Sequence, residues 1–149
     1  MDLAEQLKKL FASNFSAYVL SHGAHQVVQG ASFYEYHKLF QKIYEFLQSE
    51  IDSQGELIRQ IDEIPPFSLK RISELSDVTD VEAAPDTKGL VEAVDAALYT
   101  LIDLANDAFD KSAEDKEYGI NNYLGGYIQQ LDKFCWFLRV STLADTPAK

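Results

Sequence analysis

The sequence has little of what loop-rich and disulfide-stabilised proteins depend on. It contains one cysteine, Cys135, four prolines and seven glycines among 149 residues. A single thiol excludes an intrachain disulfide and fits a reducing compartment. Few turn-forming residues favour a small number of long elements. The sequence also lacks an apolar leader and any run of about 18 apolar residues, which predicts a soluble cytoplasmic protein with no membrane partner.

Basic residues are scarce as well. Lysine and arginine number 13 against 24 acidic residues, a formal net charge of −11. This balance repels phosphate backbones and attracts cations where acids cluster, so nucleic acid is a poor default partner. With 46% hydrophobic and 25% charged residues, the chain is not largely disordered. Its length predicts a single domain over residues 1–149.

Apolar residues at helical spacing predict four long helices. The first covers residues 3–29 and ends at Gly30. The second begins after Ser32, where Ser32 and Glu35 can form a capping box, and it reaches residue 61 before two prolines. It is unusually long.

A long crossover follows over residues 62–86, with one short helical run, SLKRISEL. Helical spacing resumes near Thr87, with Asp86 as its cap, and a polar stretch at residues 110–119 precedes the last helix. No strand pattern or internal repeat occurs. The sequence therefore predicts an all-α, ferritin-like four-helix bundle with a short extra helix in the long crossover between the second and third helices.

Four residues form the candidate metal site. His25 and His37 lie on either side of the break at Gly30, and Asp52 and Glu56 lie four apart on the second helix, off its apolar stripe. Two imidazoles and two carboxylates suit iron, manganese, zinc or cobalt and leave coordination positions open.

Helix geometry decides how these four residues can meet. His37 and Asp52 are 15 positions apart on one predicted helix, which separates them by roughly 22 Å at about 1.5 Å per residue. Ligands of one metal lie within a few ångströms of each other, since each bond is only about 2 Å long. If all four bind one metal, the carboxylates must come from another subunit, as a two-fold dimer allows.

The same residues carry a resemblance to a known family, the Dps mini-ferritins. His25, His37, Asp52 and Glu56 match the family's signature at every interval, twelve, fifteen and four positions. The segments GASFYEYHKLF, SLKRISEL after two prolines, and LDKFCWFLR at residues 131–139 are similar to family segments. The resemblance covers nearly the whole chain.

This resemblance implies a homo-oligomer, a hollow dodecameric shell built from two-fold dimers. It implies a ferroxidase that oxidises iron(II), preferably with hydrogen peroxide, at dimer-interface centres and stores the ferric product inside. His25, His37, Asp52 and Glu56 are then both the iron ligands and the catalytic residues. The alternative is a DNA-protecting shell of the same type with weak or impaired ferroxidase activity.

The chain departs from the family pattern beside both histidines. Gln26 stands where the family usually has tryptophan, and Tyr34, Tyr36 or Tyr44 are candidates to replace that ring. Gln41 stands where an aspartate often assists a second metal, which predicts a weak second iron position.

A third departure affects iron entry. Asn121 and Asn122 stand where members often carry pore-lining aspartates. The candidate entry residues are therefore Asp110, Glu114, Asp115 and Glu117.

Other distinctive residues have structural explanations. We expect a surface or packing role for His22, and a place in the core for Trp136 and the tyrosines. We expect Cys135 to be a small buried residue and residues 112–117 to form a solvated loop.

DNA binding depends on basic charge that this sequence lacks. The segment STLADTPAK at residues 141–149 offers one lysine, and Lys8 and Lys9 are balanced by nearby Asp2 and Glu5. Because phosphate neutralisation dominates non-specific affinity, we expect no appreciable DNA binding at physiological salt.

Overall fold

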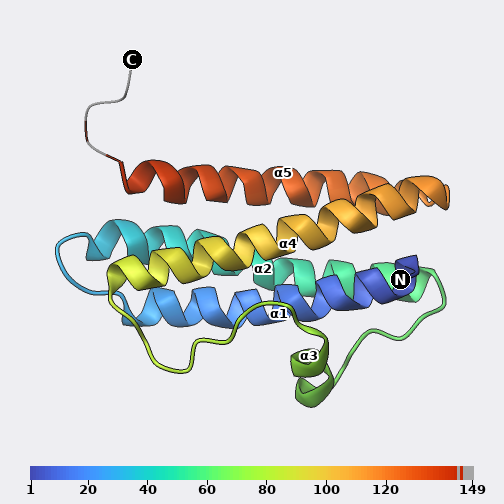
Figure 1. The fold of residues 1–149 in the computed structure, drawn as a ribbon, viewed down its shortest axis with the longest axis horizontal. Coiled ribbons are helices and arrows are strands. Elements are labelled where there is room, and N and C mark those ends of the chain that lie inside the picture. Colours follow the sequence, from blue (N-terminus) through green and yellow to red (C-terminus); the bar gives the residue numbers. More distant parts are fainter. Residues whose placement is uncertain (144, 146–149) are drawn as a thin grey trace.

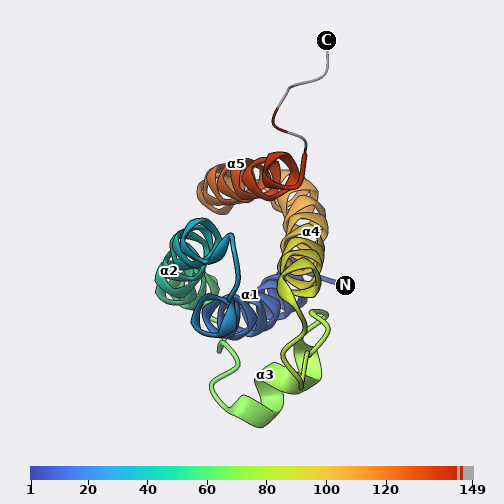
Figure 2. The same cartoon turned by 90° about the vertical axis from the view of Figure 1, so that its left-hand side faces the viewer.

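The computed structural model describes residues 1–143 and residue 145. It contains α1 (Leu3–Val27), α2 (Phe33–Gln60), α3 (Leu69–Leu75), α4 (Thr87–Glu114) and α5 (Tyr118–Ser141), and no strand within the described residues. The four long helices form a bundle, while α3 lies outside it against α1 (Figures 1 and 2). The predicted all-α four-helix bundle with an extra helix in the crossover is confirmed. In the described part of the chain, no helix has the length and apolar character needed to cross a membrane.

Of the two helix caps predicted from the sequence, one is confirmed and one is wrong. Asp86 caps α4 as predicted, since the Gly89 N–H donates to its carboxylate at 2.9 Å. The capping box predicted at Ser32 is wrong, because no hydrogen bond reaches the Ser32 side chain. Its backbone angles, φ −103° and ψ 24°, are those of a turn, whereas a capping side chain needs an extended backbone. A capping box forms instead at Asp2 and Glu5, at the start of α1.

The bundle interior is filled almost entirely by aliphatic side chains. The apolar side chains with no more than 1% exposure are mostly large and come from all four long helices; they include Leu10, Phe40, Ile43, Leu47, Ile58, Leu98, Leu101, Leu124, Leu131 and Leu138. Each contributes about 1.5–3 kcal/mol by leaving water. Cys135 is buried, as predicted. Trp136 is 48% exposed, so its predicted place in the core is wrong, because it lies on the outer face of α5 one position beyond the buried stripe.

The polar connection between the last two helices is shorter than predicted. Residues 110–114 belong to α4, and only residues 115–117 link it to α5. The predicted loop over residues 112–117 is therefore wrong in its first half. Lys111 explains the extra turn, because its amine pairs with Glu114 and Asp115 at helical spacing and lies at the C-terminal end of the helix dipole.

A small polar cluster, which no sequence pattern predicted, interrupts the apolar interior. The Tyr127 hydroxyl donates to the Asn14 side-chain oxygen at 2.8 Å, and the Asn14 amide donates to the Leu47 carbonyl at 2.9 Å. The Tyr123 hydroxyl donates to the Glu50 carboxylate. These bonds join α1, α2 and α5 across the core. Burial raises the pKa of both tyrosine hydroxyls, so they stay protonated and act as donors.

Candidate metal centre

His25 and His37 form a reciprocal pair. Their rings stack with centroids 3.8 Å apart at an interplanar angle of 17°. The Nδ1 atom of His25 lies 2.7 Å from the His37 carbonyl oxygen, and the Nδ1 atom of His37 lies 2.7 Å from the His25 carbonyl oxygen. A carbonyl oxygen can only accept, so each Nδ1–H must be the donor. In the neutral rings, both Nε2 atoms therefore keep a free lone pair.

The short connection between α1 and α2 produces this pairing. Gly30 adopts φ +103°, a conformation that other residues rarely reach, and lets the chain reverse within a few residues. Val28 is buried and anchors the turn against the core. Because the two histidines lie at near-equal distances from the turn, the antiparallel helices bring them to the same level. The symmetry of their positions in the sequence thus has a structural cause.

This arrangement is the one that metal-binding histidines generally show. A ligating imidazole usually donates its second N–H to a carbonyl or carboxylate, which fixes the tautomer and the ring orientation. Here each ring meets that condition through the main chain of the other. Both side chains are half-buried, so they combine restricted motion with access from outside.

Aromatic side chains hold the pair from one side. The Tyr44 ring packs edge-on against His25 at 5.1 Å and stacks on His22 at 4.0 Å. The His22 ring also pairs with the Tyr18 hydroxyl at 3.1 Å, so its predicted packing role is confirmed.

Of the three tyrosines proposed to replace the missing tryptophan, Tyr44 is the one packed against His25. Tyr36 instead donates to the Ser141 carbonyl at 3.4 Å. Tyr34 is 65% exposed and lies under the Lys38 amine. Two of the three therefore do not lie in the core as predicted, since Tyr36 is only half-buried.

The two candidate carboxylates lie far along α2. Asp52 and Glu56 are exposed on one face of this helix, which runs without interruption from Phe33 to Gln60. The rise of a helix places Asp52 roughly 22 Å from His37. Within the described residues of one copy, no three histidine, cysteine, aspartate or glutamate side chains gather closely enough to hold a metal. One copy thus offers two imidazoles at one end and two carboxylates at the other.

The Gln41 side chain is engaged within its own helix and not in a ligand position. Its side-chain amide donates to the Glu45 carboxylate at 2.9 Å, along the same helix. Gln26, at the other departure from the family pattern, is exposed.

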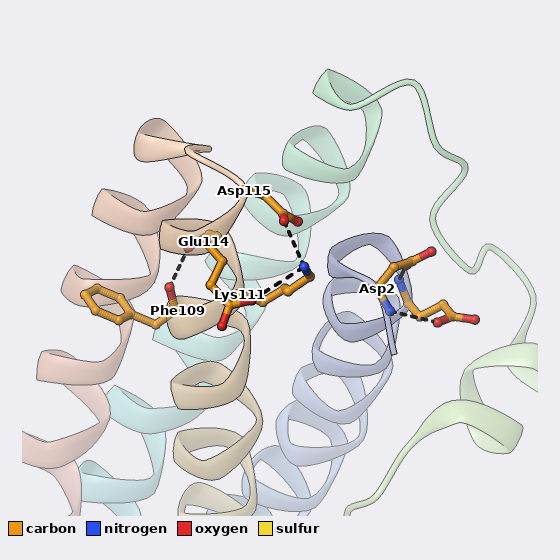
Figure 3. A network of polar contacts seen from close by, with 7 residues as sticks. Asp2, Phe109, Lys111, Glu114 and Asp115 are labelled. Atoms are coloured by element: carbon orange, nitrogen blue, oxygen red, sulfur yellow. Dashed lines mark hydrogen bonds and ion pairs between the residues drawn. The ribbon is translucent and has the colours of Figure 1, made fainter.

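The candidate entry residues cluster at the α4–α5 connection. Asp110, Glu114, Asp115 and Glu117 are all exposed there. Figure 3 shows the Lys111 amine reaching the Asp115 carboxylate, at 2.8 Å, and the Glu114 carboxylate, at 3.6 Å. The hydrogen bond to Asp115 raises the pKa of Lys111, so two of the four acids are partly neutralised by a firmly charged amine.

Asn121, at the start of α5, faces this connection from inside. Its amide donates to the Phe109 carbonyl of α4 at 2.9 Å, a carbonyl that also accepts from the Ser112 hydroxyl at 2.8 Å. It therefore joins two helices within one copy.

Known proteins resemble this chain along most of its length. The family described as ferritin-like domain matches residues 4–144. DNA protection during starvation protein 2 of Bacillus anthracis is 24% identical over 135 residues, covering 91% of this chain and 92% of that protein. The structure of a Dps protein from Vibrio cholerae O1, described as a ferritin-like diiron-carboxylate protein, superimposes with a TM-score of 0.90 at 24% identity, covering 95% of this chain and 89% of that one.

A further structural match bears on the histidines. It is a variant of Listeria innocua Dps in which two histidines twelve positions apart are replaced by glycine, with a TM-score of 0.90 at 19% identity, covering 94% of this chain and 93% of that one. The interval equals that between His25 and His37. The sequence and fold resemble those of Dps proteins, and the chain belongs to the ferritin-like domain family.

Proposed function

We propose that this protein oxidises iron(II), preferably with hydrogen peroxide, at centres shared by two copies, and stores the ferric product. Each centre takes His25 and His37 from one copy and Asp52 and Glu56 from the other. The observation that carries the proposal is the reciprocal histidine pair, whose two Nε2 atoms remain free for a metal. The carboxylates of the same copy are too distant to complete the site, so a second copy must supply them.

The ligand set suits iron as a substrate. Imidazole nitrogens hold iron(II), while carboxylates favour the iron(III) that forms from it. Two iron(II) ions each give one electron to hydrogen peroxide, its O–O bond breaks, and two protons complete two water molecules. The reaction consumes iron(II) and peroxide together and thereby removes both reagents of hydroxyl-radical formation.

The second iron position is the weaker part of this centre. Gln41 offers an amide where a carboxylate would help, and that amide is already engaged with Glu45. We therefore infer that one iron is held firmly and that the second arrives transiently.

Storage requires an enclosed space and a route into it. We propose a dodecameric shell built from the two-fold dimers, with iron entering past Asp110, Glu114, Asp115 and Glu117. Support comes from the match to Dps structures over most of the chain and from the net charge of −11, which attracts cations.

DNA protection is the second candidate, favoured by the name of the Bacillus anthracis relative. The two lysines near the start of α1 argue against it. The Lys8 amine pairs with Glu63 at 2.6 Å and the Lys9 amine with Asp77 at 3.0 Å, so both are neutralised, though by other partners than the sequence suggested. The single lysine of residues 141–149 lies outside the described residues. We expect no retention of plasmid in a gel-shift at physiological salt.

The iron proposal is tested by comparing peroxide-dependent and oxygen-dependent iron(II) oxidation in the wild type and in Asp52→Ala. A shared centre predicts a large loss of the peroxide-dependent rate in the variant. His22→Ala is the matched control, since it removes an imidazole beside the pair without removing a proposed ligand. Equal rates for wild type and Asp52→Ala would refute the assignment. Native mass measurement tests the dodecamer independently.

A further inference from the structure

One buried amide inside the bundle lacks the partners that its polar atoms need. The Gln54 side chain, on α2, is only 3% exposed, and neither its Oε1 nor its Nε2 atom forms a hydrogen bond with a described residue. Buried polar side chains are nearly always paired, because an unpaired one has lost its hydrogen bonds to water and gained none in exchange. An orphaned amide of this kind therefore marks a candidate binding site.

Hydroxyl and carboxylate oxygens lie beside this amide, between α2 and α5 (Figure 2). Burial raises the pKa of the Tyr123 and Tyr127 hydroxyls, and the Gln54 side chain next to them lowers it. The Tyr123 hydroxyl donates to the Glu50 carboxylate, one turn before Gln54 on α2, and the Tyr127 hydroxyl donates to Asn14. Each phenol has thus used its only proton, and each phenol oxygen keeps a free lone pair.

Glu50 gives this group of atoms a negative charge. Its side chain is half-buried, and none of the ion pairs among the described residues includes it. Withdrawing an unpaired carboxylate from water is unfavourable, so a positive charge beside Glu50 would be stabilising. Carboxylate, amide and hydroxyl oxygens are also the ligands that hard cations prefer. Both the charge and the donor atoms therefore favour a cation over an anion or a neutral ligand.

These residues are separate from the proposed iron centre. Gln54 lies two positions from both Asp52 and Glu56, and two positions turn a helix by about 200°. Gln54 accordingly is buried, whereas Asp52 and Glu56 are exposed on the other side of α2. The two groups differ in chemistry as well, since the buried one contains a single carboxylate and no imidazole.

We propose that Glu50, Gln54 and Tyr123 bind one monovalent metal cation, potassium or an ion of its class, inside the bundle. The Glu50 carboxylate neutralises its charge, and the Gln54 amide oxygen and the Tyr123 hydroxyl oxygen act as neutral ligands. Protein oxygens can replace the hydration shell of potassium in this way. A single carboxylate matches a single positive charge, whereas a divalent ion would leave an excess charge away from water. The bound ion links α2 to α5 and makes the stability of the bundle depend on potassium.

The first test measures the stability of the full-length protein against potassium. Urea unfolding is followed at several potassium chloride concentrations and one protein concentration, with choline chloride holding the ionic strength constant. Because the ion binds the folded chain only, the ratio of folded to unfolded protein should rise about tenfold for each tenfold increase in potassium above the dissociation constant. Equal stability at every potassium concentration would overturn the proposal.

Two variants and a matched control assign the response to these residues. Glu50→Gln keeps the size of the side chain and removes its charge, and Gln54→Leu removes the amide, so both should lose the response to potassium. Without potassium, Gln54→Leu should be at least as stable as the wild type, because it has no orphaned amide. Glu45→Gln removes an exposed carboxylate from the same helix and should keep the full response. A response retained by Glu50→Gln, or lost in Glu45→Gln, would contradict the assignment.

Diffraction locates the ion directly. Rubidium can take the place of potassium and has a strong anomalous signal. Crystals of the wild type in rubidium chloride should show an anomalous peak between Glu50 and Gln54, and crystals of Glu50→Gln should show none. Density without an anomalous signal at this place would identify a water molecule and refute the cation. None of these measurements uses iron, so their failure would leave the proposed iron centre untouched.

Discussion

Subunit mixing gives the most decisive test of a centre shared between copies. His25→Ala removes one imidazole, and Asp52→Ala removes one carboxylate, so each variant alone has only defective centres. Separation by roughly 22 Å along α2 means that neither residue can serve the other within its own chain. A mixed dimer, however, contains one centre with both defects and one with all four native ligands.

The expected recovery follows from counting. After dissociation, mixing in equal amounts and reassembly, about half of the dimers are mixed, and each has one intact centre of two, so about one quarter of all centres recover. The assay is the initial rate of peroxide-dependent iron(II) oxidation, followed by absorbance of the ferric product. The mixture should therefore reach about one quarter of the wild-type rate, against near-background rates for each variant alone.

A control separates shared from single-chain centres in the opposite direction. Wild type mixed with the double variant His25→Ala/Asp52→Ala should retain about one quarter of its centres if they are shared, and about one half if each chain holds its own. No recovery in the first mixture, together with retention of one half in the second, would refute the two-copy centre.

Three further predictions concern the fold. Tyr127→Phe leaves the buried Asn14 side-chain oxygen without its donor and should lower the free energy of unfolding by about 1–3 kcal/mol in urea titrations. Gly30→Ala should destabilise by about 1–2 kcal/mol because of its positive φ, whereas Gly23→Ala should be neutral or stabilising by up to about 1 kcal/mol, although both sites have open space. Burial raises the pKa of the Cys135 thiol from 9.0 to about 12, so at pH 8 it stays protonated and should react with a thiol reagent only after denaturation.

Each of these has a clear contrary outcome. An unchanged urea midpoint in Tyr127→Phe would show that the polar cluster contributes no net stability. Equal effects of the two glycine substitutions would remove the role assigned to the turn conformation. Rapid labelling of Cys135 in the native state at pH 8 would contradict the burial of its thiol.

The sequence by itself determined most of the architecture. Helical periodicity located all four long helices, and the errors in their extent lie at their ends, where single hydrogen bonds decide. Ser32 has the right side chain for a cap, yet the turn set by Gly30 gives it the wrong backbone angles. Lys111 extends α4 by ion pairs whose strength depends on the fold around them.

The members of the proposed centre stay a prediction from the sequence, whereas the geometry of its histidine pair comes from the structure. The spacing of His25, His37, Asp52 and Glu56, with the fixed rise of a helix, already indicated that one chain cannot join them. Only the tertiary structure shows the reciprocal Nδ1–H bonds that free both Nε2 atoms, because these depend on the level at which two antiparallel helices meet. An apolar groove between α1 and the crossover is likewise a product of packing, because Val19 and Val27 line it from α1 and Ile72, distant in sequence, lines it from α3.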